Sequence, residues 1–183
     1  MKTIDYYKDK VKPGRETRLY NEWRMMEEAF SSHEVISYDV IKHTPSGLPV
    51  GYEVTFRIRS IIGVDEPDAQ GFQKPVFGDQ HVLRITLPNN YPSADGGYPD
   101  FTFVTDVWHP NVRYFGEFKG HVCLNFENCG TSTSLAEYVG KVADYLRYDD
   151  YHALDEEPYP EDQTVAQWVR EQGDILRLLR SSQ

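Results

Sequence analysis

One stretch of the sequence, WHPNVRYFGEFKGHVCLN at residues 108–125, constrains this chain more than any other. Pro110 fixes its own φ angle and disfavours a helical conformation at His109, so a rigid extended turn is expected there. Asn111 follows directly, and Cys123 comes twelve residues later. A thiol can attack acyl groups, and an amide N–H can donate to the resulting oxyanion. The stretch therefore predicts acyl chemistry on sulfur, and the alternative is a buried structural cysteine near an ordinary turn.

Charge and cysteine content limit the compartment and the binding partners that can be expected for this protein. The 183 residues include 19 Lys+Arg and 29 Asp+Glu, a formal net charge of −10, which disfavours binding to nucleic-acid phosphates. No apolar run resembles a signal peptide or reaches the length of a membrane span. The two cysteines, Cys123 and Cys129, provide no disulfide framework. We expect a cytoplasmic protein with no nucleic-acid or membrane partner, and we assign it no cofactor and no metal ion.

Hydrophobic periodicity predicts one domain at residues 15–183, preceded by a charged leader at residues 1–14. Apolar residues within 15–30 recur at steps of four, three and four, which is typical of one helix face. Four later segments alternate apolar and polar residues or are short and apolar, and they predict strands at residues 35–43, 52–61, 81–87 and 101–105. Residues 63–79 are expected to form a long polar loop.

The strand signals stop after Cys123, and helix signals follow. Ser134 and Glu137 match a capping box, which predicts a helix start. Pro158 to Asp162 reads as a stop followed by a second helix start, and Gly173 is expected to kink that helix. The order of elements predicts an α+β domain with an N-terminal helix, a four-stranded antiparallel meander and C-terminal helices.

Four motifs in this order resemble the ubiquitin-conjugating enzyme family: ITLPNNYP at 85–92, FTFVTDVWHPN at 101–111, VCL at 122–124 and PYPED at 158–162. Each motif alone is weak, but their order and the flanking helices form a specific signal over about residues 15–180. The resemblance implies the fold of that family. It also implies three partners, namely an ATP-dependent activating enzyme, a ubiquitin-like protein and a protein acceptor.

The resemblance also implies roles for individual residues. Cys123 matches the cysteine that carries the ubiquitin-like protein as a thioester, and Asn111 matches the residue credited with stabilising the oxyanion or ordering the active-site loop. Asp162 matches the acid thought to position the incoming lysine, although helix capping alone would explain an acid there. His109 and Pro110 are expected to hold the turn, and a general base at His109 is the less favoured interpretation.

Several departures from the family pattern accompany the resemblance. The family normally places its cysteine eight residues after the asparagine, so the twelve-residue spacing here enlarges the intervening flap. The tryptophan usually found after the cysteine is absent, and Ser93 replaces the apolar residue with which relatives dock RING-type ligases. An acidic stretch at 147–157 is also inserted. These departures make a RING-type ligase partner doubtful and indicate a divergent branch, for which a prokaryotic source is one interpretation.

Two alternatives to a conjugating enzyme remain at this stage. A catalytically inactive variant would keep the fold as a binding or scaffolding protein, but such variants typically lose the cysteine. A zinc site could be built from nitrogen and sulfur ligands, although the spacings are irregular; its candidates are His109, His121, Cys123 and Cys129. Cys129 could also be a second nucleophile or a redox partner of Cys123. We interpret it as an ordinary loop residue.

Overall fold

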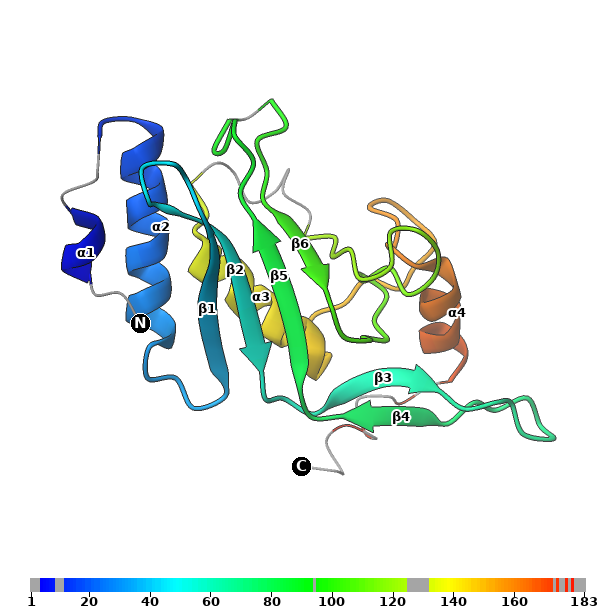
Figure 1. The fold of residues 1–183 in the computed structure, drawn as a ribbon. Helices are drawn as coiled ribbons and strands as arrows, with labels where there is room; N and C mark the ends of the chain where they lie inside the picture. Colours follow the sequence, from blue (N-terminus) through cyan, green and yellow to red (C-terminus); the bar gives the residue numbers. More distant parts are fainter. Residues whose placement is uncertain are drawn as a thin grey trace.

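The structure is a computed structural model that describes residues 4–8, 12–93, 95–124, 132–172, 174, 177 and 179. Its elements in chain order are α1 (Ile4–Lys8), α2 (Arg15–Phe30), β1 (Ile36–His43), β2 (Pro49–Phe56), β3 (Ser60–Val64), β4 (Pro75–Gly78), β5 (His81–Thr86), β6 (Asp100–Phe103), α3 (Leu135–Arg147) and α4 (Gln163–Glu171). Figure 1 shows a twisted sheet with α1 and α2 beside β1 and α4 beyond β6. The predicted α+β class is confirmed.

The main sheet is antiparallel with the strand order β1-β2-β5-β6. Leu83 of β5 pairs with Val54 of β2 and with Phe103 of β6, and all three are buried. Alternation along β5 leaves Arg84 exposed, as expected for a strand with one face on the core. Helix α3 crosses behind this sheet in Figure 1, and its buried side chains belong to the same core cluster.

Helix α2 has the bounds and the buried face that its periodicity predicts. Helix α1, which lies within the predicted leader, packs on its outer side (Figure 1). Tyr7 of α1 is buried, with its ring centroid 4.5 Å from that of Trp23, and its hydroxyl lies 3.3 Å from His43 Nε2. The division into leader and domain stays a prediction.

The expected loop at residues 63–79 is wrong in part, because strands β3 and β4 form a hairpin there. Their pairing runs from Ser60 opposite Gly78 to Val64 opposite Pro75. The predicted second strand therefore divides into β2 and β3. Ile61 of β3 is fully buried in a second cluster that includes Trp168 of α4. The two strands, SIIGV and PVFG, are short and apolar, and the polar residues of this segment form the loop between them. A distant helix supplies the apolar partner of Ile61.

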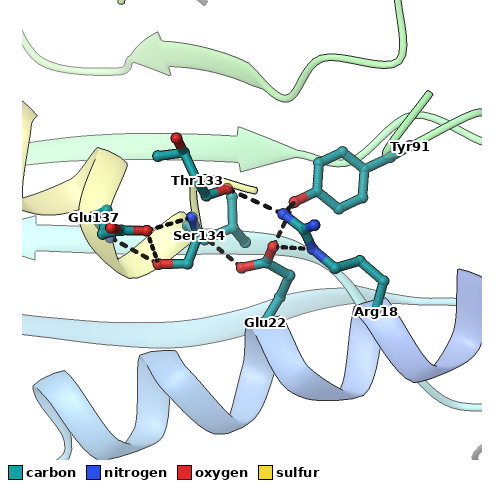
Figure 2. A network of polar contacts seen from close by, with 7 residues as sticks. Arg18, Glu22, Tyr91, Thr133, Ser134 and Glu137 are labelled. Atoms are coloured by element: carbon teal, nitrogen blue, oxygen red, sulfur yellow. Dashed lines mark hydrogen bonds and ion pairs between the residues drawn. The ribbon is translucent and has the colours of Figure 1, made fainter. Parts of the chain in front are cut away.

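A buried polar network joins α2 to the start of α3 (Figure 2). Glu22 accepts hydrogen bonds from Arg18 Nε at 2.6 Å, from the Tyr91 hydroxyl at 2.5 Å and from the Leu135 N–H at 2.7 Å. Arg18 also donates to the Thr133 carbonyl at 3.0 Å. The network therefore fixes the segment that leads into α3.

The predicted capping box at the start of α3 is confirmed. The Glu137 N–H donates to Ser134 Oγ at 3.2 Å, and the Ser134 N–H donates to Glu137 Oε2 at 2.7 Å. Helix α4 begins after Asp162, as predicted, whereas Gly173 lies outside the described residues. Within the part of the chain that the structure describes, none of the helices is long and apolar enough to cross a bilayer.

Candidate active site

The His-Pro-Asn turn follows β6 and is held by a fully buried histidine. His109 stacks on Tyr145, with ring centroids 4.7 Å apart. Its Nδ1 accepts the Asn111 N–H at 3.1 Å, so its Nε2 is free to donate to the Asp150 carbonyl at 3.1 Å. Burial lowers the pKa of His109 to about 3, and the hydrogen bond to Asp150 offsets this only in part. The ring is neutral near pH 7, and both of its nitrogens hold the turn.

The side chain of Asn111 is oriented by a backbone group. Its Oδ1 accepts the His152 N–H at 3.0 Å. A backbone N–H can only donate, so this contact identifies Oδ1 and leaves the Nδ2 amino group pointing away from His152. The Asn111 carbonyl accepts the Cys123 N–H at 2.9 Å. The asparagine therefore contacts the cysteine backbone and keeps its amino group as a donor.

Cys123 is a free, partly exposed thiol held between the turn and α3. Its N–H donates to Asn111, and its carbonyl accepts the Tyr145 hydroxyl at 3.2 Å. The flanking residues Val122 and Leu124 are buried. The backbone of Cys123 is therefore anchored by hydrogen bonds, while the residue remains partly exposed.

Cys123 and Asn111 share the wall of one cavity of about 120 Å³. The cavity is lined by Asn111, Cys123, Lys141, Tyr145, Asp150, His152, Pro158 and Tyr159. These residues come from the His-Pro-Asn turn, the cysteine segment, α3 and the segment before α4. The structure thus brings together two of the three catalytic residues predicted from the sequence.

Asp162 occupies a different position. Its Oδ1 accepts the N–H groups of Thr164 and Val165 at 3.0 and 3.2 Å, and its Oδ2 accepts the Tyr114 N–H at 2.9 Å. The residue is buried, and its own N–H donates to the Pro110 carbonyl at 3.0 Å. The carboxylate caps α4 and ties it to the His-Pro-Asn turn and the flap.

The enlarged flap between Asn111 and Cys123 is a loop whose two ends are joined by backbone hydrogen bonds. Its base is held by the Arg113 N–H donating to the His121 carbonyl at 2.9 Å and by the Gly120 N–H donating to the Arg113 carbonyl at 2.7 Å. Gly120 has φ 92°, and a Cβ there would lie 2.2 Å from the Phe103 carbonyl oxygen, so only glycine fits. The tip exposes Phe118 by 70%.

An ionic cluster fastens the flap to the segment before α4. Glu161 Oε1 lies 3.2 Å from His121 Nδ1 and 3.4 Å from Arg113 Nε. The hydrogen bond to Glu161 raises the pKa of His121, against the opposing effect of burial. Burial alone would raise the pKa of Glu161, but the hydrogen bond and charge of His121, followed by Arg113, lower it overall.

The acidic insert is anchored at its base. Tyr148 caps α3 in the left-handed conformation at φ 56°, and its hydroxyl donates to the Trp108 carbonyl. Ala153 is buried, and its carbonyl accepts a hydrogen bond from Arg170 of α4. The acidic side chains of the insert are exposed: Asp149, Asp150, Asp155, Glu156 and Glu157. The insert therefore presents carboxylates at the rim of the cavity that Asp150 lines.

The alternatives built on Cys129 cannot be placed, because that residue lies outside the described residues. For the zinc hypothesis, both His109 nitrogens are already hydrogen-bonded, and His121 Nδ1 contacts Glu161. Within the residues that the structure describes, no group of three or more His, Cys, Asp or Glu side chains is arranged to hold a metal ion.

Six residues of the cavity were not assigned to the site from the sequence: Lys141, Tyr145, Asp150, His152, Pro158 and Tyr159. Lys141 and Tyr145 are four residues apart on α3 and therefore share a face, but no sequence signal placed that face beside the cysteine. His152 contacts Asn111 through its backbone N–H. Every residue except proline has this group, so the residue type could not indicate the contact.

The fold and the site define an α+β domain in which a free thiol and an oriented amide share one cavity. A relative by sequence is the Ubiquitin-conjugating enzyme E2-22 kDa of Drosophila melanogaster, 27% identical over 106 residues, which cover 57% of this chain and 47% of that protein. The matched region thus spans about half of the curated relative. Over this region the chain is similar in sequence to a ubiquitin-conjugating enzyme.

A solved structure similar to this one is the ubiquitin-conjugating enzyme E2 UbcA1 from Agrocybe aegerita. It is 16% identical with a TM-score of 0.46, and the match covers 86% of this chain and 94% of that one. No known family profile matches the chain.

Proposed function

We propose that the chain is a conjugating enzyme for a ubiquitin-like protein. In this proposal Cys123 accepts the C-terminal acyl group of that protein from an activating enzyme as a thioester and passes it to an amine of a protein acceptor. The observation that carries the proposal is the shared cavity of Cys123 and Asn111, in which the Asn111 amide is oriented by the His152 N–H at 3.0 Å.

Loading is an exchange between two sulfurs. The Cys123 thiolate attacks the carbonyl of the activating enzyme's thioester, the new C–S bond forms, and the activating enzyme leaves as a thiolate that takes a proton. A tetrahedral oxyanion lies between the two thioesters. The Asn111 Nδ2 group is the donor assigned to an oxyanion at this site, because its amide oxygen is occupied.

Transfer to an amine needs an uncharged nucleophile. The acceptor ammonium loses a proton to solvent, and the neutral amine attacks the Cys123 thioester, so that a C–N bond forms and the C–S bond breaks. The second nitrogen proton passes to the departing Cys123 thiolate. We assign the orienting of the acceptor to Asp150, which lines the cavity and has an exposed side chain. Asp162, the residue matched by sequence, accepts three backbone N–H groups, so we assign it a positioning role at the junction of turn, flap and α4.

Charging is the direct test of the proposed function. The full chain is mixed with ATP, a ubiquitin-like protein and its activating enzyme, and the products are run on a gel without reductant. A shifted band that disappears with thiol is expected for the unchanged chain and for Cys129→Ser, and not for Cys123→Ala. Charging of Cys123→Ala, or no charging with any activating enzyme from the source organism, would contradict the proposal.

A RING-type ligase is not expected to be required. Apolar anchors at the centre of an interface carry most of its binding energy, and Ser93 supplies none at the position where relatives dock such ligases. The nearby Tyr91 hydroxyl and Arg18 guanidinium are engaged in the network of Figure 2. Conjugation with purified components and no ligase tests this. Conjugation only after a RING protein is added would overturn it.

A further inference from the structure

Lys141 of α3 lines the same cavity as Cys123. Tyr145 lies four residues further along this helix, and its hydroxyl donates to the Cys123 carbonyl at 3.2 Å. Residues four apart share a helix face, with Cβ atoms about 5–6 Å from each other. Both observations place the Lys141 side chain close to the thiol.

The Lys141 ammonium also differs from a second lysine near the site. Lys119, in the flap, lies 2.7 Å from Asp106 Oδ1 and 4.8 Å from the centre of the Tyr114 ring. Among the described residues, Lys141 takes part in none of the ion pairs. An amine that is not held by a carboxylate can turn into the cavity without breaking a contact.

We propose that Lys141 is an internal acyl acceptor, so that an acyl group carried by Cys123 as a thioester can pass to Lys141 Nζ. The proposal deepens the proposed function and rests on it for the identity of the acyl group. Its consequence is a self-modification that competes with external acceptors. A charged chain that meets no acceptor would convert slowly to a stable amide inside its own cavity.

The transfer balances without any further reactant. The Lys141 ammonium first loses one proton to solvent. The neutral amine then attacks the thioester carbonyl, the C–N bond forms and the C–S bond breaks. The second proton leaves the nitrogen of the tetrahedral intermediate and ends on the Cys123 thiolate. The products are an amide at Lys141 and a free thiol at Cys123. Asn111 Nδ2 would face the same oxyanion as in transfer to an external amine.

A small acyl donor tests this without an activating enzyme. The full chain in a Cys129→Ser background is incubated with the mercaptoethanesulfonate thioester of acetyl-Gly-Gly, which can exchange onto Cys123. After treatment with thiol, peptide mapping by mass spectrometry measures the amide at each lysine. Matched samples carry Cys123→Ala, Lys141→Arg or Lys119→Arg. Circular dichroism and the amount of thiol-sensitive adduct before treatment report whether each variant is folded and charged.

The expected result is an amide at Lys141 that forms at least about tenfold faster than at Lys119, because an amine in the same cavity as the thioester has a high effective concentration. This amide should be lost in Cys123→Ala and unaffected by Lys119→Arg. Equal labelling of the lysines, or labelling of Lys141 that persists in Cys123→Ala, would overturn the proposal. Because the donor needs no activating enzyme, a failure of this transfer is distinguishable from a failure of enzymatic charging.

Discussion

The carboxylate of Glu22 on α2 accepts the backbone N–H of Leu135 at 2.7 Å, across a separation of 113 residues. The side chain is 1% exposed, and it also accepts from Arg18 and Tyr91. This contact joins the first long helix to the helix whose face carries Lys141 and Tyr145 (Figure 2). The position of the cavity wall therefore depends on a buried charge on the other side of the core.

Glu22→Ala should lower the free energy of unfolding by about 3–5 kcal/mol, because it leaves the other members of a buried ionic network without their partner. A matched control lies on the same helix. Arg24 and Glu28 have the same spacing as Arg18 and Glu22, but Glu28 is 74% exposed, so Glu28→Ala should cost no more than about 0.5 kcal/mol. Urea unfolding of both variants measures this. Equal losses would mean that the network contributes no more than a surface pair.

Asn111→Asp should slow transfer to an amine about 100- to 1000-fold, the usual effect of removing one oxyanion donor. The substitution keeps an oxygen for the His152 N–H, replaces the amino group with a second oxygen and adds one negative charge. Loading should be affected less, since the activating enzyme can contribute to that step. Single-turnover discharge of purified thioester measures the effect, with the exposed Asn89→Asp as a charge-matched control. Equal losses in loading and discharge would indicate a structural role.

Two aspartates near the site should respond in opposite ways to substitution. Asp162→Ala removes the acceptor of three backbone N–H groups and should lower the free energy of unfolding by about 1–3 kcal/mol. Asp150→Asn should leave stability within about 0.5 kcal/mol and slow discharge to lysine. Denaturant unfolding and discharge kinetics of both variants check this. If Asp162→Asn slows discharge but leaves the free energy of unfolding unchanged, the acid that orients the acceptor is Asp162 and not Asp150.

His109 should make the protein sensitive to acid. Its pKa of about 3 in the folded state lies below the usual value of 6.5, so the unfolded state binds the proton first as the pH falls. The free energy of unfolding should therefore decline below about pH 6.5, by up to about 1.4 kcal/mol per pH unit from this group. Chemical unfolding between pH 4.5 and 7 should show a shallower decline in His109→Gln. Parallel curves for the two proteins would contradict the assignment.

The acidic insert should attract cationic acceptors to the cavity. Replacing Asp149, Asp155, Glu156 and Glu157 by their amides keeps Asp150 and should slow discharge to a lysine-bearing protein. The salt dependence of the rate should also flatten, since steering by exposed charges is screened over about 8 Å at physiological ionic strength. Discharge rates across a salt series measure both effects. The control is Asp65→Asn with Glu66→Gln, and an unchanged rate in the insert variant would leave a solvated acidic loop as the explanation.

The sequence alone determined the local features of this protein. The periodicity of residues 15–30 predicted α2, and Ser134 with Glu137 predicted the start of α3, because helix faces and caps depend on residues three or four apart. The alternation in β5 likewise predicted its buried face. The Pro110 turn and the cysteine twelve residues after Asn111 also indicated that Asn111 and Cys123 form a pair, and both residues line one cavity in the structure.

The tertiary structure decided what depends on partners distant in the chain. The β3–β4 hairpin has short apolar strands around a polar loop, and it is stabilised through Ile61, which packs in a cluster with Trp168 of α4. Asp162 is matched by sequence to a catalytic acid, but its oxygens are taken by N–H groups up to 48 residues away. Lys141 lines the same cavity as Cys123, because Tyr145 of the same helix contacts Cys123 across 22 residues. Side-chain type determines local conformation, whereas packing of distant segments determines which groups meet.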